Sequence, residues 1–178
     1  MKKRSYSFKG QLDIGVLGVQ LAKLVLRRYY PQIIDYADRK NMQLRGIDLL
    51  IPDLGYLEVK TDTHSARRFF FELSVGTKPG AVDRSCADWF CVIYPQERVI
   101  YLIPRPELQM WLRNNMPWIR RDCPDWIKHT NSVSEGRTWR ATGVVVPVRR
   151  IMTDIRIEVI QWKEDDEQVR DAEWKEGK

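Results

Sequence analysis

The chain of 178 residues contains few cysteines and no long apolar run. Cys86, Cys91 and Cys123 form no C-x-x-C pair, which argues against both a disulfide framework and a cysteine zinc site. No apolar run approaches the roughly 20 residues of a membrane-spanning helix, and no apolar signal core follows the basic start. These absences favour a protein with reduced thiols in the cytoplasm.

The net charge of +6 is unevenly distributed along the chain. Residues 163–178 include four basic and seven acidic residues, so this tail carries −3 and the remainder carries +9. A positive body suits a polyanionic partner such as nucleic acid, because neutralised phosphates release counterions. We expect residues 1–162 to form one domain and residues 163–178 to form a charged, poorly ordered tail.

The hydrophobic pattern predicts a mixed α/β domain. A mostly apolar helix is expected over 13–30, followed by a β-hairpin of strands 44–51 and 56–61 that turns at Pro52-Asp53-Leu54-Gly55. The other expected elements are a short helix or link over 33–41, a strand over 69–75, a hairpin of 89–94 and 98–103, a helix over 104–114, a loop over 129–140, a strand over 143–148, and a strand or helix over 152–162. This order predicts a central mixed β-sheet flanked by helices.

Polar residues interrupt both strands of the first hairpin. Side chains alternate along a strand, so Glu58 and Lys60 share one face of the returning strand. A connection of three residues, 52–54, would place Asp48 opposite Glu58 and on that same face. A connection one residue longer would turn Asp48 to the other face, so we predict the shorter one, or a β-bulge with the same effect.

Two carboxylates and a lysine in this arrangement have a chemical use. Neighbouring carboxylates repel each other, and a bound cation removes that conflict. Magnesium prefers hard oxygen ligands and activates water for attack on a phosphate. A nearby lysine can orient that water or stabilise the developing charge. The alternative is an ordinary half-exposed strand with Glu58 and Lys60 in solvent, and the presence of Asp48 in the partner strand favours a site instead.

The pattern Gly46-Ile47-Asp48, nine residues, then Glu58-Val59-Lys60 resembles the PD-(D/E)XK nuclease superfamily. That superfamily includes restriction enzymes, Holliday-junction resolvases and phage exonucleases. Downstream, Lys78-Pro79-Gly80 followed by Ser85-Cys86-Ala87-Asp88-Trp89 is similar to a stretch of its phage- and RecB-like members. The resemblance covers residues 13–108. It implies a restriction-endonuclease-like core and a bacterial or phage-encoded enzyme that hydrolyses DNA.

The resemblance also implies roles for particular residues. Asp48 and Glu58 would bind Mg²⁺ or Mn²⁺, with the Val59 carbonyl as a third ligand and Lys60 as the catalytic lysine. Glu72 in the next strand would support this group or pair with Lys60; a solvated or salt-bridged strand residue is the alternative. Many nucleases of this kind pair up to cut two strands, which makes a homodimer a further expectation.

The first helix departs from the superfamily's pattern. Many members place a glutamate there, whereas this chain has Gln20, with Asp13 as another candidate. Glutamine can coordinate or donate hydrogen bonds but brings no charge; the alternative for Gln20 is a polar spot on a buried helix. This departure motivates a rival reading, a catalytically inactive nuclease-fold protein that binds DNA or assists assembly. A further rival is a basic protein that binds a protein partner.

Other basic and aromatic residues are candidates for nucleic-acid contacts. Arg67, Arg68 and Lys78 flank the expected cleft and could bind phosphates. His64 could do the same or lie in a solvated loop. Tryptophans and arginines alternate within 111–126, which suits either unpaired bases or a packed core.

Overall fold

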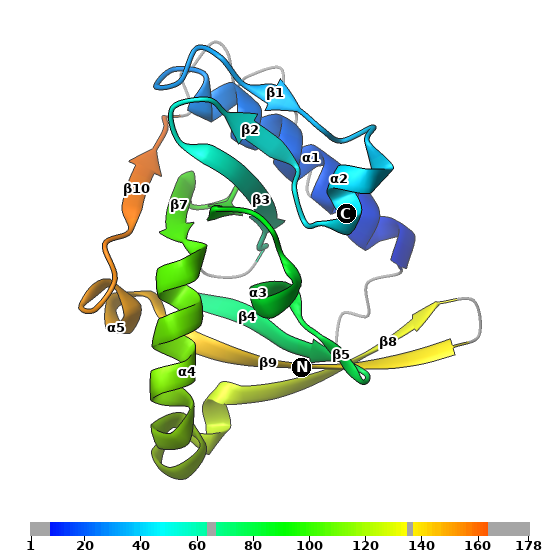
Figure 1. The fold of residues 1–178 in the computed structure, drawn as a ribbon, viewed down its shortest axis with the longest axis vertical. Coiled ribbons are helices and arrows are strands. Elements are labelled where there is room, and N and C mark those ends of the chain that lie inside the picture. Colours follow the sequence, from blue (N-terminus) through cyan, green and yellow to red (C-terminus); the bar gives the residue numbers. More distant parts are fainter. Residues whose placement is uncertain (1–7, 64–66, 135–136, 164–178) are drawn as a thin grey trace.

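The computed structural model describes residues 8–63, 67–134 and 137–163. Its central sheet has six strands in the order β1-β2-β3-β6-β7-β10 (Figure 1). The strands are β1 (Ile34–Asp35), β2 (Leu49–Ile51), β3 (Gly55–Thr61), β6 (Trp89–Tyr94), β7 (Val99–Pro104) and β10 (Glu158–Gln161). The β3–β6 pair is parallel and the other pairs are antiparallel. The predicted α/β class with a central mixed sheet is confirmed.

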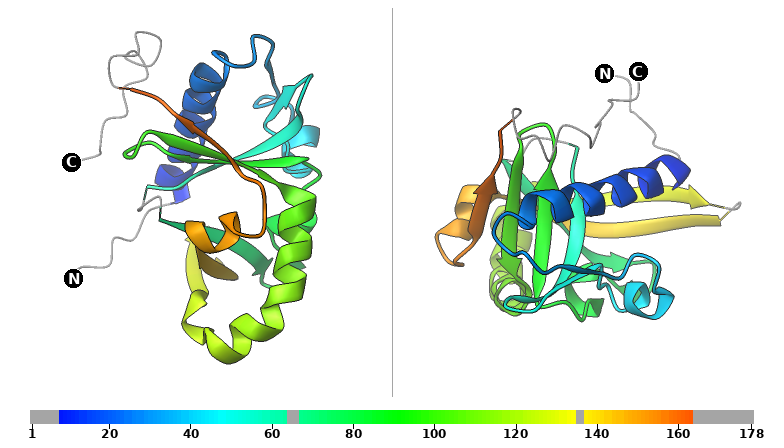
Figure 2. Two further views of the ribbon diagram at one scale, coloured as in Figure 1. Left: turned by 90° about the vertical axis from the view of Figure 1, so that its left-hand side faces the viewer. Right: turned by 90° about the horizontal axis from the view of Figure 1, so that it is seen from above.

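Helix α1 (Phe8–Leu26) covers one face of this sheet (Figure 2). Its apolar residues Leu21, Val25 and Leu26 are buried against strand residues of the sheet. Gly18 permits the close approach, because a Cβ there would lie 1.7 Å from Thr61 Oγ1. The mostly apolar character that predicted this helix therefore reflects a buried packing surface.

A second sheet lies on the opposite side of the central one (Figure 2). Its order is β5 (Lys78–Pro79), β4 (Arg68–Val75), β9 (Arg137–Pro147) and β8 (Ile127–Ser134). The strand predicted over 69–75 exists, but it pairs in this second sheet. The loop predicted over 129–140 is wrong, since most of this segment forms the β8–β9 hairpin. Its residues are mostly polar, so cross-strand pairing forms it where no apolar alternation could predict it.

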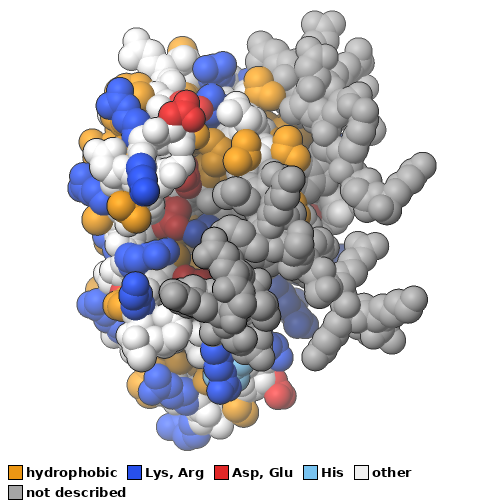
Figure 3. Space-filling model, turned by 90° about the vertical axis from the view of Figure 1, so that its right-hand side faces the viewer, with side chains coloured by type: hydrophobic (Ala, Val, Ile, Leu, Met, Phe, Trp, Pro, Cys, Tyr) orange, Lys and Arg blue, Asp and Glu red, His pale blue; other side chains and the backbone are white. Residues whose placement is uncertain are grey.

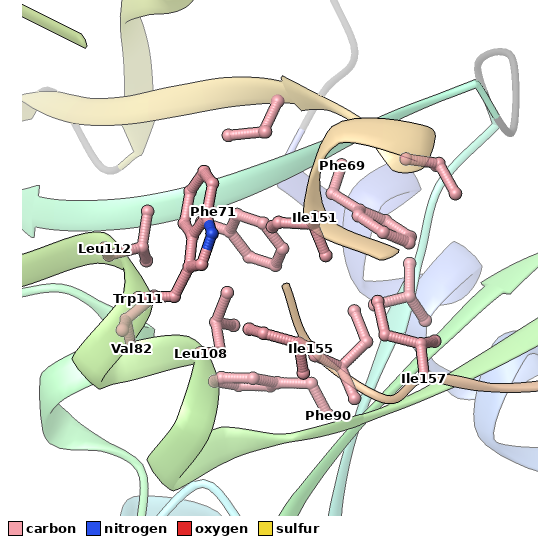
Figure 4. Close-up of a cluster of buried hydrophobic side chains, with 14 of the residues drawn as sticks. Phe69, Phe71, Val82, Phe90, Leu108, Trp111, Leu112, Ile151, Ile155 and Ile157 are labelled. Atoms are coloured by element: carbon pink, nitrogen blue, oxygen red, sulfur yellow. The ribbon is translucent and has the colours of Figure 1, made fainter. Parts of the chain in front are cut away.

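A core of aromatic and aliphatic side chains fills the space between the sheets (Figure 4). Phe69 and Phe71 of β4 meet Phe90 of β6, and Leu108 and Trp111 of α4 close one side. The smaller helices α3 (Ala81–Arg84) and α5 (Val148–Met152) contribute further buried residues. This core and the one beneath α1 hold β3 between them.

Several predicted boundaries need correction. The strand expected over 44–51 begins only at Leu49, because Lys40–Leu44 form α2. The helix expected over 104–114 is α4 (Arg105–Asp122), which continues through Pro117 and buries Ile119, with the single-turn η1 (Pro124–Trp126) after it.

For two segments, 33–41 and 152–162, the sequence pattern leaves two structures open. Residues 33–41 hold β1 and the start of α2, and residues 152–162 hold the end of α5 and all of β10. Residues 164–178 of the predicted tail lie outside the described part. Within the described residues, no helix is long and apolar enough to cross a membrane.

Candidate active site

The β2–β3 hairpin has the register that the sequence predicts. Leu49 pairs with Leu57 and Ile51 pairs with Gly55, which leaves a three-residue connection. The paired ladder ends at Leu49, and Asp48 lies directly before it. The Asp48 amide donates to the Leu57 carbonyl at 2.9 Å, so Asp48 and Leu49 both lie opposite Leu57, as in a β-bulge. The Glu58 charge acts on Asp48, so the two acids lie close to each other.

Glu58 and Lys60 lie on the face of β3 that looks toward the second sheet. In the parallel pairing with β6, Glu58 is level with Phe90 and Lys60 is level with Val92. Phe90 and Val92 belong to the core between the two sheets, whereas Val59 packs in the core beneath α1. The predicted alternation therefore holds, and α1 lies on the other face from Glu58 and Lys60.

Glu58 is buried beside a lysine. Only 5% of the residue is exposed, and its Oε1 lies 2.5 Å from Lys60 Nζ. The Lys60 side chain is 46% exposed, so it reaches from the buried acid to solvent. The second oxygen, Glu58 Oε2, is buried and has no hydrogen-bond partner among the described residues. A buried carboxylate oxygen in that state is costly, which favours a partner from outside the chain.

Asp48 is half-buried and fixed by the backbone of the neighbouring strand. Its Oδ2 accepts a hydrogen bond from the Val59 amide at 2.7 Å. Burial raises the pKa of Asp48 above its ordinary value; the Val59 amide opposes that rise, and the Glu58 carboxylate adds to it. The Glu58 carboxylate thus disfavours the charge of Asp48, as the sequence argument expected of a pair that shares a site.

Gly46 and Ser85 enclose the unpartnered oxygen of Glu58. Gly46 has φ +68°, and a Cβ there would lie 2.8 Å from Glu58 Oε2 and 3.0 Å from Ser85 Oγ. Ser85 is buried; its hydroxyl donates to the Gly46 carbonyl at 3.2 Å and accepts from the Ala87 amide at 3.1 Å. Sequence reasoning noticed Ser85 only as part of a motif and missed its position beside Glu58.

Gln20 is part of a polar chain on the side of α1. It is exposed, and its Oε1 accepts a hydrogen bond from Lys23 Nζ at 3.3 Å. Lys23 in turn lies 2.5 Å from Asp35 Oδ2 in β1. Burial opposes ionisation of Asp35, but hydrogen bonds from Lys23 and the Ala37 amide outweigh it and hold the pKa of Asp35 below its ordinary value.

This polar chain approaches the acids through Asp35, whose charge contributes to the raised pKa of Asp48. The hydrogen bond of Gln20 is to Lys23, and no side-chain bond between Gln20 and Asp48 or Glu58 occurs in the described residues. The spacing of Gln20 and Lys23 on one helix face could have suggested their contact. The side chain of Asp13 lies outside the described part.

Glu72 shares a cavity with Lys60 without pairing to it. The cavity, of about 170 Å³, is bounded by residues of β3, β4, β6 and α3, with both Lys60 and Glu72 in its wall. Glu72 is half-buried, and among the residues described here no ion pair joins it to Lys60. The prediction that Glu72 lies near the site is thus consistent with the cavity, whereas direct pairing with Lys60 is not seen.

The tryptophans of the 111–126 segment are engaged in packing. Trp111 is buried, and its Nε1 donates to Asp154 Oδ2 at 2.7 Å. The Arg150 guanidinium lies 5.7 Å from the ring centroids of both Trp111 and Trp118, and Trp118 meets Trp126 edge-on at 5.5 Å. These contacts favour the packed-core interpretation over a surface for unpaired bases.

Basic side chains surround a recess on one face of the molecule. Figure 3 shows acidic side chains lying in this recess, with lysine and arginine side chains around it. Arg67, Arg68 and Lys78, the predicted phosphate contacts, are all exposed. His64 lies outside the described residues.

Comparisons of the chain with protein-family models, with curated proteins and with solved structures find no match. Among the described residues there is no group of three or more histidine, cysteine, aspartate or glutamate side chains placed to hold a metal ion. The acidic groups that the hairpin brings together are the two carboxylates of Asp48 and Glu58.

Proposed function

We propose that this protein is a metal-dependent nuclease of the PD-(D/E)XK class, with a restriction-endonuclease-like core, that hydrolyses phosphodiester bonds of DNA. Asp48 and Glu58 hold Mg²⁺ or Mn²⁺, and Lys60 is the catalytic lysine. One observation carries the proposal: the hairpin brings the Asp48 and Glu58 carboxylates close enough for the Glu58 charge to act on Asp48, and Lys60 contacts a Glu58 carboxylate whose other oxygen is buried without a hydrogen-bond partner among the described residues.

The residues fit a divalent cation. In the described part of the chain no donor reaches Glu58 Oε2, and the charge of Asp48 is disfavoured by burial and by Glu58. Both groups supply the hard oxygen ligands that Mg²⁺ prefers, and the Val59 carbonyl is the candidate for a third. A bound cation would polarise the phosphate and make water a stronger nucleophile at neutral pH.

The protein's own groups position the reactants. Lys60 is oriented by its contact with Glu58 Oε1, and its exposure lets the ammonium donate hydrogen bonds to a phosphate oxygen or to the attacking water. The Val59 amide donates a hydrogen bond to Asp48 Oδ2, which fixes the orientation of the carboxylate. The basic body attracts the polyanionic substrate, because its charge is positive over the folded part of the chain.

Cleavage by the full chain and by two lysine variants tests the proposal. Wild-type protein with Mg²⁺ should cut DNA, and Lys60→Ala should lower the rate by a factor on the order of 10²–10⁴. Lys128→Ala, which removes an exposed lysine of β8, is the matched control and should retain the wild-type rate. Equal cutting of single-stranded, duplex and branched DNA by wild type and Lys60→Ala would refute the assignment.

A second candidate function is DNA binding or assembly without cleavage. It is favoured by the position of Gln20, which is hydrogen-bonded to Lys23, and by the absence, among the described residues, of a group of three or more acidic, histidine or cysteine side chains placed to hold a metal ion. Binding that weakens steeply with salt, without cleavage in Mg²⁺ or Mn²⁺, would support it. Weak DNA binding without that salt dependence would point instead to a protein partner.

A further inference from the structure

The cavity beside Lys60 differs in chemistry from a phosphate site. Its floor consists of buried apolar side chains from three elements, including Phe71, Ala81, Phe90 and Val92. Figure 4 shows the Phe71 and Phe90 rings within the core between the sheets. An apolar floor provides no hydrogen bonds to an anion, so a phosphate would be poorly solvated there.

The cavity adjoins the proposed reaction centre directly. Phe90 is level with Glu58 and Val92 is level with Lys60 in the β3–β6 pairing. Lys60 is exposed where the cavity meets solvent, and Glu72 is half-buried in its wall. A phosphodiester held at Lys60 would therefore have its neighbouring sugar and base next to an apolar space.

The volume suits one six-membered ring. A cavity of roughly 150 Å³ with apolar walls binds benzene, and this cavity measures about 170 Å³. A pyrimidine matches that size, whereas a purine has a second fused ring. The Glu72 carboxylate can accept a hydrogen bond from the exocyclic amine of cytosine, a group that thymine lacks.

We propose that this cavity binds the base of one unpaired pyrimidine nucleotide, cytosine in preference to thymine, next to the bond that is cut. The inference rests on the proposed nuclease function and names its substrate class. A base enters the cavity only after it leaves the duplex stack, so single-stranded DNA and frayed ends are preferred over intact duplex. Contact with an aromatic floor strengthens binding by roughly 5- to 150-fold per base.

Binding of short dye-labelled oligonucleotides tests this preference by fluorescence anisotropy. The full chain carries Asp48→Asn, which retains Lys60 and the cavity, and Mg²⁺ is present throughout. Oligo-dC should bind on the order of 10-fold more tightly than oligo-dA, with oligo-dT between them. Equal affinity for oligo-dC and oligo-dA would overturn the inference.

Two further substitutions in that background locate the preference. Ala81→Leu adds three carbon atoms to the floor; it should bring oligo-dC binding down to the oligo-dA level and leave duplex binding unchanged. Glu72→Ala should abolish the preference for oligo-dC over oligo-dT. If Ala81→Leu lowers the melting temperature, the test rests on Glu72→Ala alone. A preference for oligo-dC over oligo-dT that persists in Glu72→Ala then overturns the inference.

Cleavage by the wild-type protein separates the two proposals. Mg²⁺-dependent cutting of DNA with no base preference in the binding assay overturns the pyrimidine cavity and leaves the nuclease assignment intact. Failure to bind or cut any DNA overturns both.

Discussion

Substitution of Gly46 by alanine tests whether the acid pair is built as described. Gly46 combines two constraints: φ is +68°, and a Cβ would lie 2.8 Å from Glu58 Oε2. Glu58 cannot easily move aside, because it is 5% exposed and its other oxygen contacts Lys60. Ser85 Oγ lies 3.0 Å from the same Cβ position and blocks the second direction of relief.

The expected loss of stability has two parts. A left-handed backbone costs an L-residue about 1–2 kcal/mol. Overpacking against a fixed carboxylate costs about 1–3 kcal/mol. Gly46→Ala should therefore lower the free energy of unfolding by about 2–5 kcal/mol, which corresponds to a fall in melting temperature of roughly 4–20 °C for a chain of this length.

Gly76→Ala is the matched control for the loss of stability that comes from the left-handed backbone alone. Gly76 has φ +57°, and a Cβ there would meet nothing within 4 Å. This variant should lose only about 1–2 kcal/mol, and it should keep Mg²⁺-dependent cleavage. Thermal unfolding by circular dichroism and cleavage of DNA are measured for both variants. Equal melting temperatures, with cleavage retained in Gly46→Ala, would refute the placement of the Glu58 carboxylate against Gly46.

Three further outcomes follow from the charges around the site. Asp48→Asn should stabilise the metal-free protein against urea above about pH 4 and should have no such effect below it. The reason is that the pKa of Asp48 is raised in the folded state, so its ionised form costs stability above the ordinary pKa. An unchanged urea midpoint at neutral pH would contradict this. Mg²⁺ at 100 times its Kd should stabilise the wild type by about 2.7 kcal/mol in thermal-shift assays, and should have little effect on Asp48→Asn or Glu58→Gln. Asp35→Asn should lower the free energy of unfolding at neutral pH, because the Lys23 contact stabilises the ionised form of Asp35. The difference from wild type should disappear as pH falls through the lowered folded-state pKa of Asp35. A difference that does not vary with pH would argue against that contact.

The sequence predicted the part of the site that local rules determine. Asp48, Glu58 and Lys60 lie within one hairpin, so strand alternation and the length of the turn decide their relative positions. The turn at Pro52-Asp53-Leu54-Gly55 has the expected composition, and the observed register confirms the predicted three-residue connection. Because these residues are close in sequence, few hairpin registers are possible.

Contacts between distant segments could not be predicted in the same way. Ser85 reaches Gly46 across 39 positions, and Lys23 reaches Asp35 between α1 and β1. Neither contact follows from periodicity, because each depends on how the elements dock. The β8–β9 hairpin was missed for a related reason: its stability comes from pairing with β4 and from its own register, not from an apolar alternation that a pattern could reveal.

Leu44 shows how apolar character can mislead at an element boundary. It is 71% exposed at the end of α2, although the pattern places it at the start of a strand. Ile47 and Leu49, which follow it, are fully buried, and the predicted strand extends too far back from them, to Leu44. Periodicity in a short run does not separate a helix end from a strand start.

The position of β3 explains how the fold tolerates the acids. Leu57 and Val59 pack beneath α1 on one face, while Phe90 and Val92 of the adjacent strand pack toward the second sheet on the other. These two cores stabilise the strand that carries Glu58, whose unpartnered oxygen alone would cost about 1–3 kcal/mol. A cation at Asp48 and Glu58 would recover that cost, whereas a purely structural strand would gain by replacing the glutamate with an apolar residue. The unpartnered oxygen of Glu58 is therefore the atom that the proposed cation would satisfy.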